Sequence, residues 1–292
     1  MKNSHPSKTV AIIQARMASS RLPGKVLLDI AGMPMLARVQ ARTSRSTTVD
    51  DVVVATTTDP SDDAVAAYCD ALGIAHTRGD QFDVLDRYYQ AARQFSAGIV
   101  VRITADCPAI DAELIDEAVA TLIGESRDSV SGAGGAQVSP TSAYDFVANR
   151  LPPPFHRTFP IGLDVEVCTF AALERAWREG QEPQHREHVM PYLYEGVQLS
   201  PISPRLSVGV SQRGFQIGLR NHAPDFGKYR WTVDTPADLD FIGEIYARFN
   251  GRDDFSWKDV LELVRLEPEL MKINAGVQHK TLRDVDERAA KR

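Results

Sequence analysis

Short β-branched runs alternate with longer amphipathic segments from residue 8 to residue 124. Residues 10–15, VAIIQA, form a near-continuous apolar run, as expected of a strand that is covered on both faces. Residues 99–104, IVVRIT, form the strongest β run of the chain. Regular alternation of strand and helix segments is typical of βαβ units around a parallel sheet. The pattern therefore predicts a single doubly wound α/β domain with a mostly parallel sheet.

The same periodicities place the individual elements. In the first half we expect strands at residues 10–15, 52–57, 74–77 and 99–104. Helices are expected at residues 34–46, 82–95 and 111–123. A further helix is expected to end at Leu72, with Asp59, Ser61 or Asp62 as its N-cap. The second half predicts a strand at 163–170, a helix at 171–178, two antiparallel strands within 199–219, a strand of the parallel type at 230–234, a helix starting at Pro236 and final helices at 257–266 and 268–274. Pro34 suits a first helical turn.

Two segments depart from this alternation. Residues 126–160 lose their periodicity and are rich in Gly, Ser and Pro, which predicts an insertion or a hairpin arm. Together with the strands expected after it, this segment indicates a β-rich insertion in the domain. Residues 276–292 are charged and nearly free of large apolar side chains, which predicts a frayed tail. We therefore expect one packed domain at residues 1–275 and a charged C-terminal tail at 276–292.

Composition excludes several classes of protein. The chain has 292 residues, of which 43% are hydrophobic, so it can bury a full core. Its net charge of −6 argues against a nucleic-acid partner, because such binding depends on many Lys and Arg contacts to phosphate. The three cysteines lie far apart without metal-ligand spacing. Neither a membrane-spanning run nor a signal peptide is visible, so we expect a cytoplasmic protein with no membrane partner.

The loop directly after the first predicted strand reads QARMASSRLPGK, residues 14–25. Its three cations, Arg16, Arg21 and Lys25, stand among small residues that allow a close backbone approach. In open α/β sheets ligands bind beyond the carboxyl ends of the strands, which is where this loop begins. The spelling is neither a Walker A loop nor GxGxxG. The sequence predicts a polyphosphate-binding loop, and a solvated basic turn is the alternative.

Two aspartates follow apolar runs that are far apart in the sequence. Asp106 follows the run at residues 99–104, and Asp234 ends the run at 230–234. If the two strands lie side by side, both carboxylates project from one edge of the sheet toward the loop. Oxygen ligands of this kind suit Mg²⁺, which usually takes only one or two from a protein. The alternatives are a helix cap or turn at Asp106 and an N-cap before Pro236 at Asp234.

The segments QARMASSRLPGKVL and AGMPML resemble the N-terminal signature of the cytidylyltransferases that make CMP-sialic acid and CMP-KDO, and they are most similar to the branch of spore coat polysaccharide biosynthesis protein F. Further resemblances follow in the expected order: RGDQFDVLDRYYQAA, VRITADCPAID, GLDVEV, REHVMPYL and RWTVDTPADL. The resemblance covers roughly residues 9–275. It implies a fold of the nucleotide-diphospho-sugar transferase type, and an enzyme that joins CMP from CTP to a sugar or sugar acid.

The resemblance also assigns roles to residues. Nucleotide binding falls to Gln14, Arg16, Ser20, Arg21, Lys25 and Arg78, the last near the base or ribose. Catalysis falls to Lys25, Arg21, Asp106 and Asp234, the two aspartates holding Mg²⁺. Sugar binding falls to Arg102, Asp164, Glu166, Glu187 and His188. Solvated surface positions are the alternative for these acidic strand residues, and a solvated helix start is the alternative for the REH segment. Arg102 could instead lie outside the sheet against a carboxylate.

One departure from the family affects the sugar. Where the CMP-KDO enzymes read QGDEP, this chain reads TADCP at residues 104–108, so an amide expected near the sugar is missing. The expected reaction is attack by a sugar hydroxyl on the α-phosphate of CTP with release of pyrophosphate, in a homodimer as the family implies.

Two other functions fit parts of the sequence. A glycosyltransferase of related fold would hold its metal with Asp-x-Asp, which occurs at Asp238 and Asp240 and at Asp284 and Asp286. The former pair falls in an expected helix and the latter in the tail. A non-catalytic nucleotide-binding protein would have lost a metal carboxylate or a phosphate cation, and the chain retains both.

Overall fold

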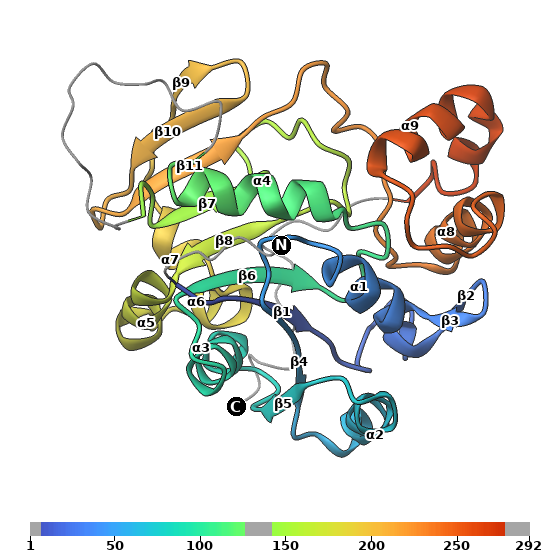
Figure 1. Ribbon diagram of the computed structural model, residues 1–292, viewed down its shortest axis with the longest axis horizontal. Coiled ribbons are helices and arrows are strands. Elements are labelled where there is room, and N and C mark those ends of the chain that lie inside the picture. The colour runs from blue at the N-terminus through green and yellow to red at the C-terminus, as the bar shows by residue number, and fades with distance from the viewer. Residues whose placement is uncertain (1–6, 126–141, 278–292) are drawn as a thin grey trace.

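The structure, a computed structural model, describes residues 7–125 and 142–277. Its main feature is a nine-stranded sheet in the order β5-β4-β1-β6-β8-β7-β11-β10-β9, with a two-stranded β2-β3 ribbon beside it (Figure 1). The strands are β1 Thr9–Gln14, β2 Asp29–Ile30, β3 Met33–Pro34, β4 Asp51–Thr57, β5 His76–Gly79, β6 Ile99–Thr104, β7 Phe146–Ala148, β8 Glu166–Thr169, β9 Ser200–Ser203, β10 Leu206–Val210 and β11 Gln216–Arg220. The α-helices are α1 Met35–Thr43, α2 Asp63–Leu72, α3 Val84–Gln94, α4 Ala112–Leu122, α5 Phe170–Glu179, α6 Pro183–His188, α7 Pro191–Tyr194, α8 Pro236–Arg248 and α9 Trp257–Leu266. Three 3₁₀ turns complete the described elements: η1 Lys25–Leu27, η2 Pro60–Asp62 and η3 Pro268–Lys272.

The four strands of the first half are parallel. β1 pairs with β4 on one side and with β6 on the other, and β5 lies beyond β4. The chain thus runs outward through β4 and β5 and then returns to the other side of β1. In doubly wound sheets ligands bind at such a switch point, beyond the carboxyl ends of the strands. The loop at residues 14–25 begins there.

Both faces of the sheet are covered, as the doubly wound prediction requires. Ala11 and Ile13 of β1 belong to a buried cluster with residues of α1, α4, α8 and α9. Val10 and Ile12 belong to a second cluster with residues of α3, α5 and α7. Alternate residues of one strand therefore point into two cores, because successive side chains of a strand lie on opposite faces.

The second half of the sheet is mixed. β8 is antiparallel to both β6 and β7, whereas β11 is parallel to β7. Residues 199–219 hold three strands rather than the predicted two, since β10 pairs antiparallel with both β11 and β9. Residues 126–160, predicted as an irregular insertion, contribute the sheet strand β7, and residues 126–141 of that segment lie outside the described part. The β-rich second half is therefore an extension of the same sheet.

Two local predictions are wrong. Residues 230–234 form no regular strand, and their only bridge is a parallel one between Ile161 and Arg230. Gly162 explains how closely the two segments approach, because a Cβ there would lie 2.5 Å from the backbone nitrogen of Thr232. Pro34 ends β3 and is the N-cap of α1 rather than part of its first turn.

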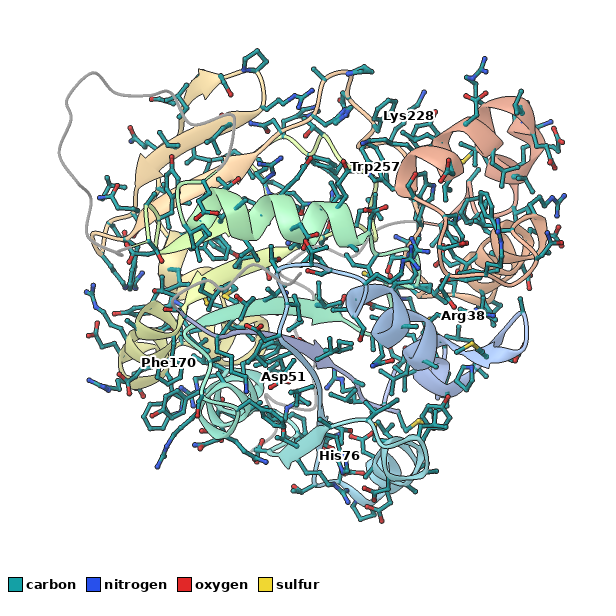
Figure 2. The ribbon with its side chains drawn as sticks, viewed as in Figure 1. Arg38, Asp51, His76, Phe170, Lys228 and Trp257 are labelled. Atoms are coloured by element: carbon teal, nitrogen blue, oxygen red, sulfur yellow. The ribbon has the colours of Figure 1, made fainter. Side chains whose placement is uncertain are left out.

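The C-terminal helices pack on α1. Arg38 of α1 is buried, and its Nη1 donates to the backbone oxygen of Gly251 at 2.6 Å and to Asp253 at 2.7 Å. Its guanidinium also lies 4.6 Å from the ring centre of Tyr246 in α8. Figure 2 labels Arg38 on the side of the molecule where α1 lies beside the C-terminal helices. Helix α9 has the predicted bounds, whereas the predicted tail lies outside the described residues apart from Gly276 and Val277. Within residues 7–125 and 142–277, no helix has the length and hydropathy needed to span a membrane.

Candidate active site

The loop after β1 is fixed by a buried carboxylate. The backbone nitrogen of Met17 donates to Asp62 Oδ1 at 2.6 Å, and the Thr57 hydroxyl donates to the other oxygen of Asp62. Asp62, 1% exposed, stands at the N-cap position of α2 but makes no side-chain cap hydrogen bond there. The loop then closes through Gly24, whose left-handed φ of 70° suits glycine and whose nitrogen donates to the Met17 oxygen. Sequence analysis considered Asp62 only as a cap and missed this role.

Lys25 lies at the centre of the site. It begins η1 and is buried, with 9% of its surface exposed. Its Nζ donates to Asp106 Oδ2 at 2.8 Å, to Asp234 Oδ1 at 2.9 Å and to the backbone oxygen of Val233 at 2.8 Å. The structure thus places three oxygens from two distant segments around one positive charge.

The backbone joins the same two segments. Asp106 follows β6 by two residues, and its backbone oxygen accepts hydrogen bonds from the Val233 nitrogen at 2.9 Å and from the Thr232 hydroxyl at 3.1 Å. The two carboxylates therefore meet at one edge of the sheet, as predicted, although Asp234 does not end a regular strand.

The charges of this group stabilise one another. Burial would raise the pKa of Asp106, but the attraction of Lys25 outweighs it and lowers that pKa to about 2. The pKa of Asp234 is also lowered, against burial and the neighbouring Asp106, by Lys25 and Arg21. Despite its burial, the pKa of Lys25 is raised by the two carboxylates. Arg21 adds a direct ion pair to Asp234 at 2.9 Å. Lys25, Asp106 and Asp234 are therefore all charged at neutral pH.

The pair Asp238 and Asp240, considered as a glycosyltransferase metal motif, does not form such a site. Asp238 is fully buried and accepts two hydrogen bonds from Arg230, at 2.8 and 3.0 Å. It also forms the capping box of α8 with Thr235, so Thr235 and not Asp234 is the N-cap. Asp238 is a structural carboxylate inside a helix, and Asp284 and Asp286 lie outside the described residues.

The other predicted nucleotide residues lie around the strand ends. Arg16 is half-buried just after β1, and Ser20 is exposed in the loop. Gln14, the last residue of β1, accepts a hydrogen bond from Arg102 at 3.2 Å, which links it to the predicted sugar residues. Arg78 lies on β5 and donates to the Thr57 backbone oxygen at 2.8 Å, at the end of β4.

The predicted sugar residues include two ion pairs. Arg102 on β6 faces Glu166 on β8 across the sheet register, and their side chains pair at 2.5 Å. Asp164 lies just before β8 and accepts two hydrogen bonds from Arg157. Nη1 donates to Oδ1, and Nη2 donates to Oδ2 at 2.9 Å. Sequence analysis missed Arg157, because its neighbours showed no periodicity.

The charge of Asp164 acts on Cys107, the residue next to Asp106. Burial raises the pKa of the Cys107 thiol, and the charges of Asp106 and, less strongly, of Asp164 raise it further. Glu187 and His188 belong to a different element from these ion pairs. They end α6, and this helix packs against α3. The following residue, Val189, has a φ of 70°, an unusual value for a β-branched side chain.

The oxygens around Lys25 suit a hard divalent cation whose remaining ligands would come from the substrate. Among residues 7–125 and 142–277 no group of three or more His, Cys, Asp or Glu side chains is placed to hold a metal by itself. Asp106, Asp234 and the Val233 oxygen nevertheless converge on one cation, the Lys25 ammonium. Two carboxylates together with substrate phosphates are the usual ligands of Mg²⁺ in phosphoryl-transfer sites.

The chain is similar to several known proteins over most of its length. The spore coat polysaccharide biosynthesis protein SpsF of Bacillus subtilis is 28% identical over 263 residues, which cover 88% of this chain and 94% of that protein. A 3-deoxy-manno-octulosonate cytidylyltransferase of Geobacter sulfurreducens is 32% identical over 251 residues, or 80% of this chain and 97% of the relative. The structure of a cytidylyltransferase from Leptospira borgpetersenii serovar Hardjo-bovis superposes with a TM-score of 0.74 at 28% identity, over 93% of this chain and 99% of that one. Residues 10–247 match the sequence profile of the cytidylyltransferases, and the chain belongs to this family of enzymes.

Proposed function

We propose that this enzyme transfers CMP from CTP to a hydroxyl group of a sugar or sugar acid, with Mg²⁺ and with release of pyrophosphate, for the synthesis of a surface polysaccharide. The observation that carries the proposal is the contact of Lys25, the last residue of the cationic loop, with Asp106 and Asp234 at the switch point of the sheet. The names of the relatives support the substrate class, since one of them acts on the sugar acid 3-deoxy-manno-octulosonate and another serves polysaccharide biosynthesis.

Asp106 and Asp234 would hold the Mg²⁺ ion together with phosphate oxygens of CTP. When bound, the ion would polarise the α-phosphate and offset its negative charge. The ion would compete with the Lys25 ammonium for Asp106 and Asp234, so ion binding would leave Lys25 free to contact phosphate. The lowered pKa values of the two carboxylates keep them ionised, as metal binding requires.

The cations of the loop would then stabilise the leaving group. Arg16, Arg21 and Lys25 lie within one loop that Asp62 and Gly24 hold in place. In-line transfer at phosphorus needs alignment and charge neutralisation more than covalent help from the protein. Three preorganised cations provide that neutralisation for the departing pyrophosphate.

The acceptor sugar would lie on the β8 side of the central carboxylates. Arg102, Glu166, Arg157 and Asp164 form two ion pairs there, and Asp164 is close enough to affect the thiol next to Asp106. Such pairs present both hydrogen-bond donors and acceptors, as several sugar hydroxyl groups require. Glu187 and His188 remain proposed sugar contacts from α6.

The test is pyrophosphate release from each of the four nucleoside triphosphates, measured against a panel of sugar acids and neutral sugars, with Mg²⁺ and with excess EDTA. We expect release only with CTP, an accepted sugar and Mg²⁺ together. Full activity in EDTA would remove the metal from the proposal, and release with every triphosphate would remove the preference for CTP.

Two further properties remain proposals. The family resemblance implies a homodimer, which sedimentation analysis of the full chain would test. A cytoplasmic location is proposed from the sequence and would be tested by cell fractionation. In the described part of the chain the glycosyltransferase alternative lacks its Asp-x-Asp metal site, because Asp238 is committed to Arg230 and to the cap of α8.

A further inference from the structure

Arg87, in the first half of α3, is a buried arginine whose hydrogen bonds are incomplete. It is 3% exposed, and its Nη1 donates to the backbone oxygen of Ala55 at 3.3 Å. Its Nε and Nη2 atoms are both buried, and neither has a hydrogen-bond partner among the residues that the structure describes. By contrast, the buried Arg38 uses Nε, Nη1 and Nη2 in hydrogen bonds. A buried guanidinium with two unused donor atoms costs stability, which makes it a candidate ligand-binding group.

The charges around Arg87 do not neutralise it directly. Burial and, less strongly, the positive charge of Arg16 lower the pKa of Arg87, and Tyr88, Asp62 and Asp80 oppose this shift, so that the pKa is about 10. Asp62 is already used by Met17 and Thr57. Arg87 therefore stays protonated at neutral pH and retains donors for a further acceptor.

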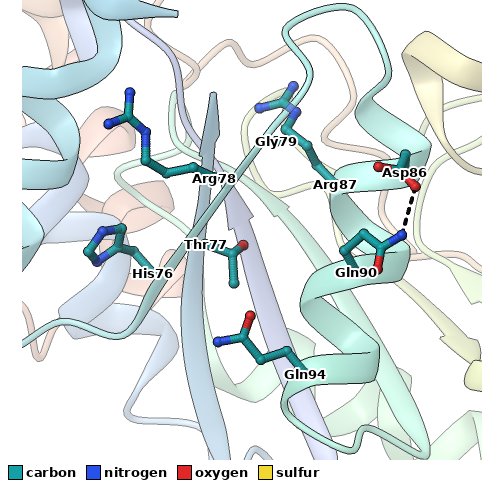
Figure 3. A pocket seen from close by; sticks show the side chains of 8 residues that line it. All are labelled: His76, Thr77, Arg78, Gly79, Asp86, Arg87, Gln90 and Gln94. Carbon is teal, nitrogen blue, oxygen red and sulfur yellow. Dashed lines mark hydrogen bonds between the residues drawn. The ribbon is translucent and has the colours of Figure 1, made fainter. Parts of the chain in front are cut away.

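Arg87 lies at the nucleotide end of the sheet. The Ala55 oxygen that it contacts also accepts a hydrogen bond from the Ala15 nitrogen at 3.2 Å, so the guanidinium lies where β1 and β4 end and the cationic loop begins. Its stem passes Gly79 at the end of β5, where a Cβ atom would lie 2.7 Å from Cγ of Arg87 (Figure 3). Gly79 and Arg87 line a cavity of about 310 Å³ between β5 and α3, within the range of roughly 300–1,000 Å³ of small-ligand pockets.

The unused atoms define which ligand fits. Nε and Nη2 form one edge of the guanidinium and offer two parallel N–H donors, which pair with two adjacent acceptors. Cytosine presents adjacent acceptors at O2 and N3, whereas uracil has an N–H donor at N3 that would oppose the arginine. Phosphate oxygens also fit this edge, but the loop already supplies Arg16, Arg21 and Lys25 for them.

We propose that Arg87 binds the cytosine ring of CTP through O2 and N3, and that this contact selects CTP over UTP. The inference rests on the proposed function, in that CTP must bind over the ends of β1 and β4. Gly79 takes part by leaving room for the arginine stem.

The test measures binding by calorimetry, with Mg²⁺ and without sugar, for CTP, UTP and pyrophosphate. For Arg87→Met we expect CTP affinity to fall about tenfold or more, in line with a lost charge-assisted pair, and the CTP-to-UTP preference to narrow toward one. Affinity for pyrophosphate should remain unchanged. Arg87→Lys keeps the charge but not the two-donor edge, so it should lose the same preference. Arg93→Met, which removes an exposed arginine from the same helix, is the matched control.

Gly79→Ala provides a second variant that displaces Arg87 without removing its charge, and it carries the test if Arg87→Met fails to fold. It should narrow the same preference. Equal losses for CTP, UTP and pyrophosphate would overturn the proposal, as would an unchanged CTP-to-UTP ratio in a folded Arg87→Met protein. If the wild type binds CTP selectively but releases no pyrophosphate with any sugar, the proposed function fails while the role of Arg87 can still be decided.

Discussion

The ammonium nitrogen of Lys25 lies 2.8 Å from Oδ2 of Asp106, although 81 residues separate the two in the sequence. Asp234 accepts from the same ammonium at 2.9 Å. This contact joins the cationic loop to the carboxylates that would hold the metal, so phosphate binding and metal binding would involve the same charges. The mutational predictions below test whether these charges act on the nucleotide.

Asp106→Asn and Asp234→Asn should each lower kcat/KM by about a thousandfold or more, because each removes a charge that would hold Mg²⁺ at the α-phosphate. Circular dichroism should show an intact fold, since both side chains lie at the sheet edge rather than in a core. Asp240→Asn, an exposed carboxylate on α8, is the matched control and should leave turnover unchanged. Near-normal turnover in either active-site variant at saturating Mg²⁺ would exclude that residue from the metal site.

Arg21→Ala and Lys25→Ala should weaken CTP binding more than CMP binding, because both side chains are expected to contact the β- and γ-phosphates. Each lost charge-assisted contact should cost about 1.5 to 3 kcal/mol. Calorimetry with both nucleotides measures this, with the exposed Arg45→Ala as control. Equal losses for CTP and CMP would place the two cations at the other end of the nucleotide.

Arg102→Lys should raise the KM for the sugar more than it weakens CTP binding, because Arg102 pairs with Glu166, a proposed sugar residue, and reaches the nucleotide residues only through Gln14. Lysine keeps the charge but loses the planar arrangement of donors that also reaches Gln14. Steady-state kinetics with each substrate varied in turn separates the two effects. A variant with weakened CTP binding and a normal sugar KM would mean that Arg102 belongs to the nucleotide half of the site.

Asp238→Ala should destabilise the protein by about 3–5 kcal/mol, since it leaves the buried Arg230 without its main partner and removes the capping box of α8. Denaturant unfolding measures the change, and Asp240→Ala on the same helix should have a small effect. If instead Asp238→Ala kept full stability and lost only activity, the structural role assigned to this carboxylate would be wrong.

The ion pair between Lys25 and Asp106 should make stability depend on pH in the acid range. The pKa of Asp106 is about 2 in the folded protein against an ordinary 3.8. Asp106 therefore contributes to the free energy of unfolding at pH values above its ordinary pKa. This contribution is lost as the pH falls through its pKa in the folded protein. Between about pH 5 and about pH 2.5 the free energy of unfolding should fall further in the wild type than in Asp106→Asn. If the free energy of unfolding fell equally in both proteins, the ionised form of the Asp106 carboxyl group would not be stabilised by folding.

The sequence predicts the first half of the fold well because its strands are local and buried on both faces. The run at residues 10–15 corresponds to β1, Thr9–Gln14, and its apolar side chains pack into both cores. Strand direction in the second half depends on pairing between distant segments. A local sequence pattern therefore could not predict the antiparallel direction of β8 or the short strand β7.

The site was predicted in part for the same reason. Position after apolar runs, together with the family resemblance, selected Lys25, Asp106 and Asp234, which the structure brings together. Asp62 and Arg157 were missed as site residues because their roles come from tertiary contacts, to Met17 and Asp164 respectively. The strand predicted at residues 230–234 failed because this segment makes isolated contacts, to Ile161 and to Asp106, in place of a ladder.

The most direct test of the central claim follows the α-phosphorus of CTP. The enzyme is incubated with CTP labelled at the α-phosphate, Mg²⁺ and the sugar or sugar acid that supports pyrophosphate release. Our account predicts that the label moves into a CMP-sugar, with one pyrophosphate formed for each CTP consumed and no turnover without the sugar. Consumption of a preformed nucleotide sugar, with no pyrophosphate released from any triphosphate across the panel, would contradict the account and favour a glycosyltransferase.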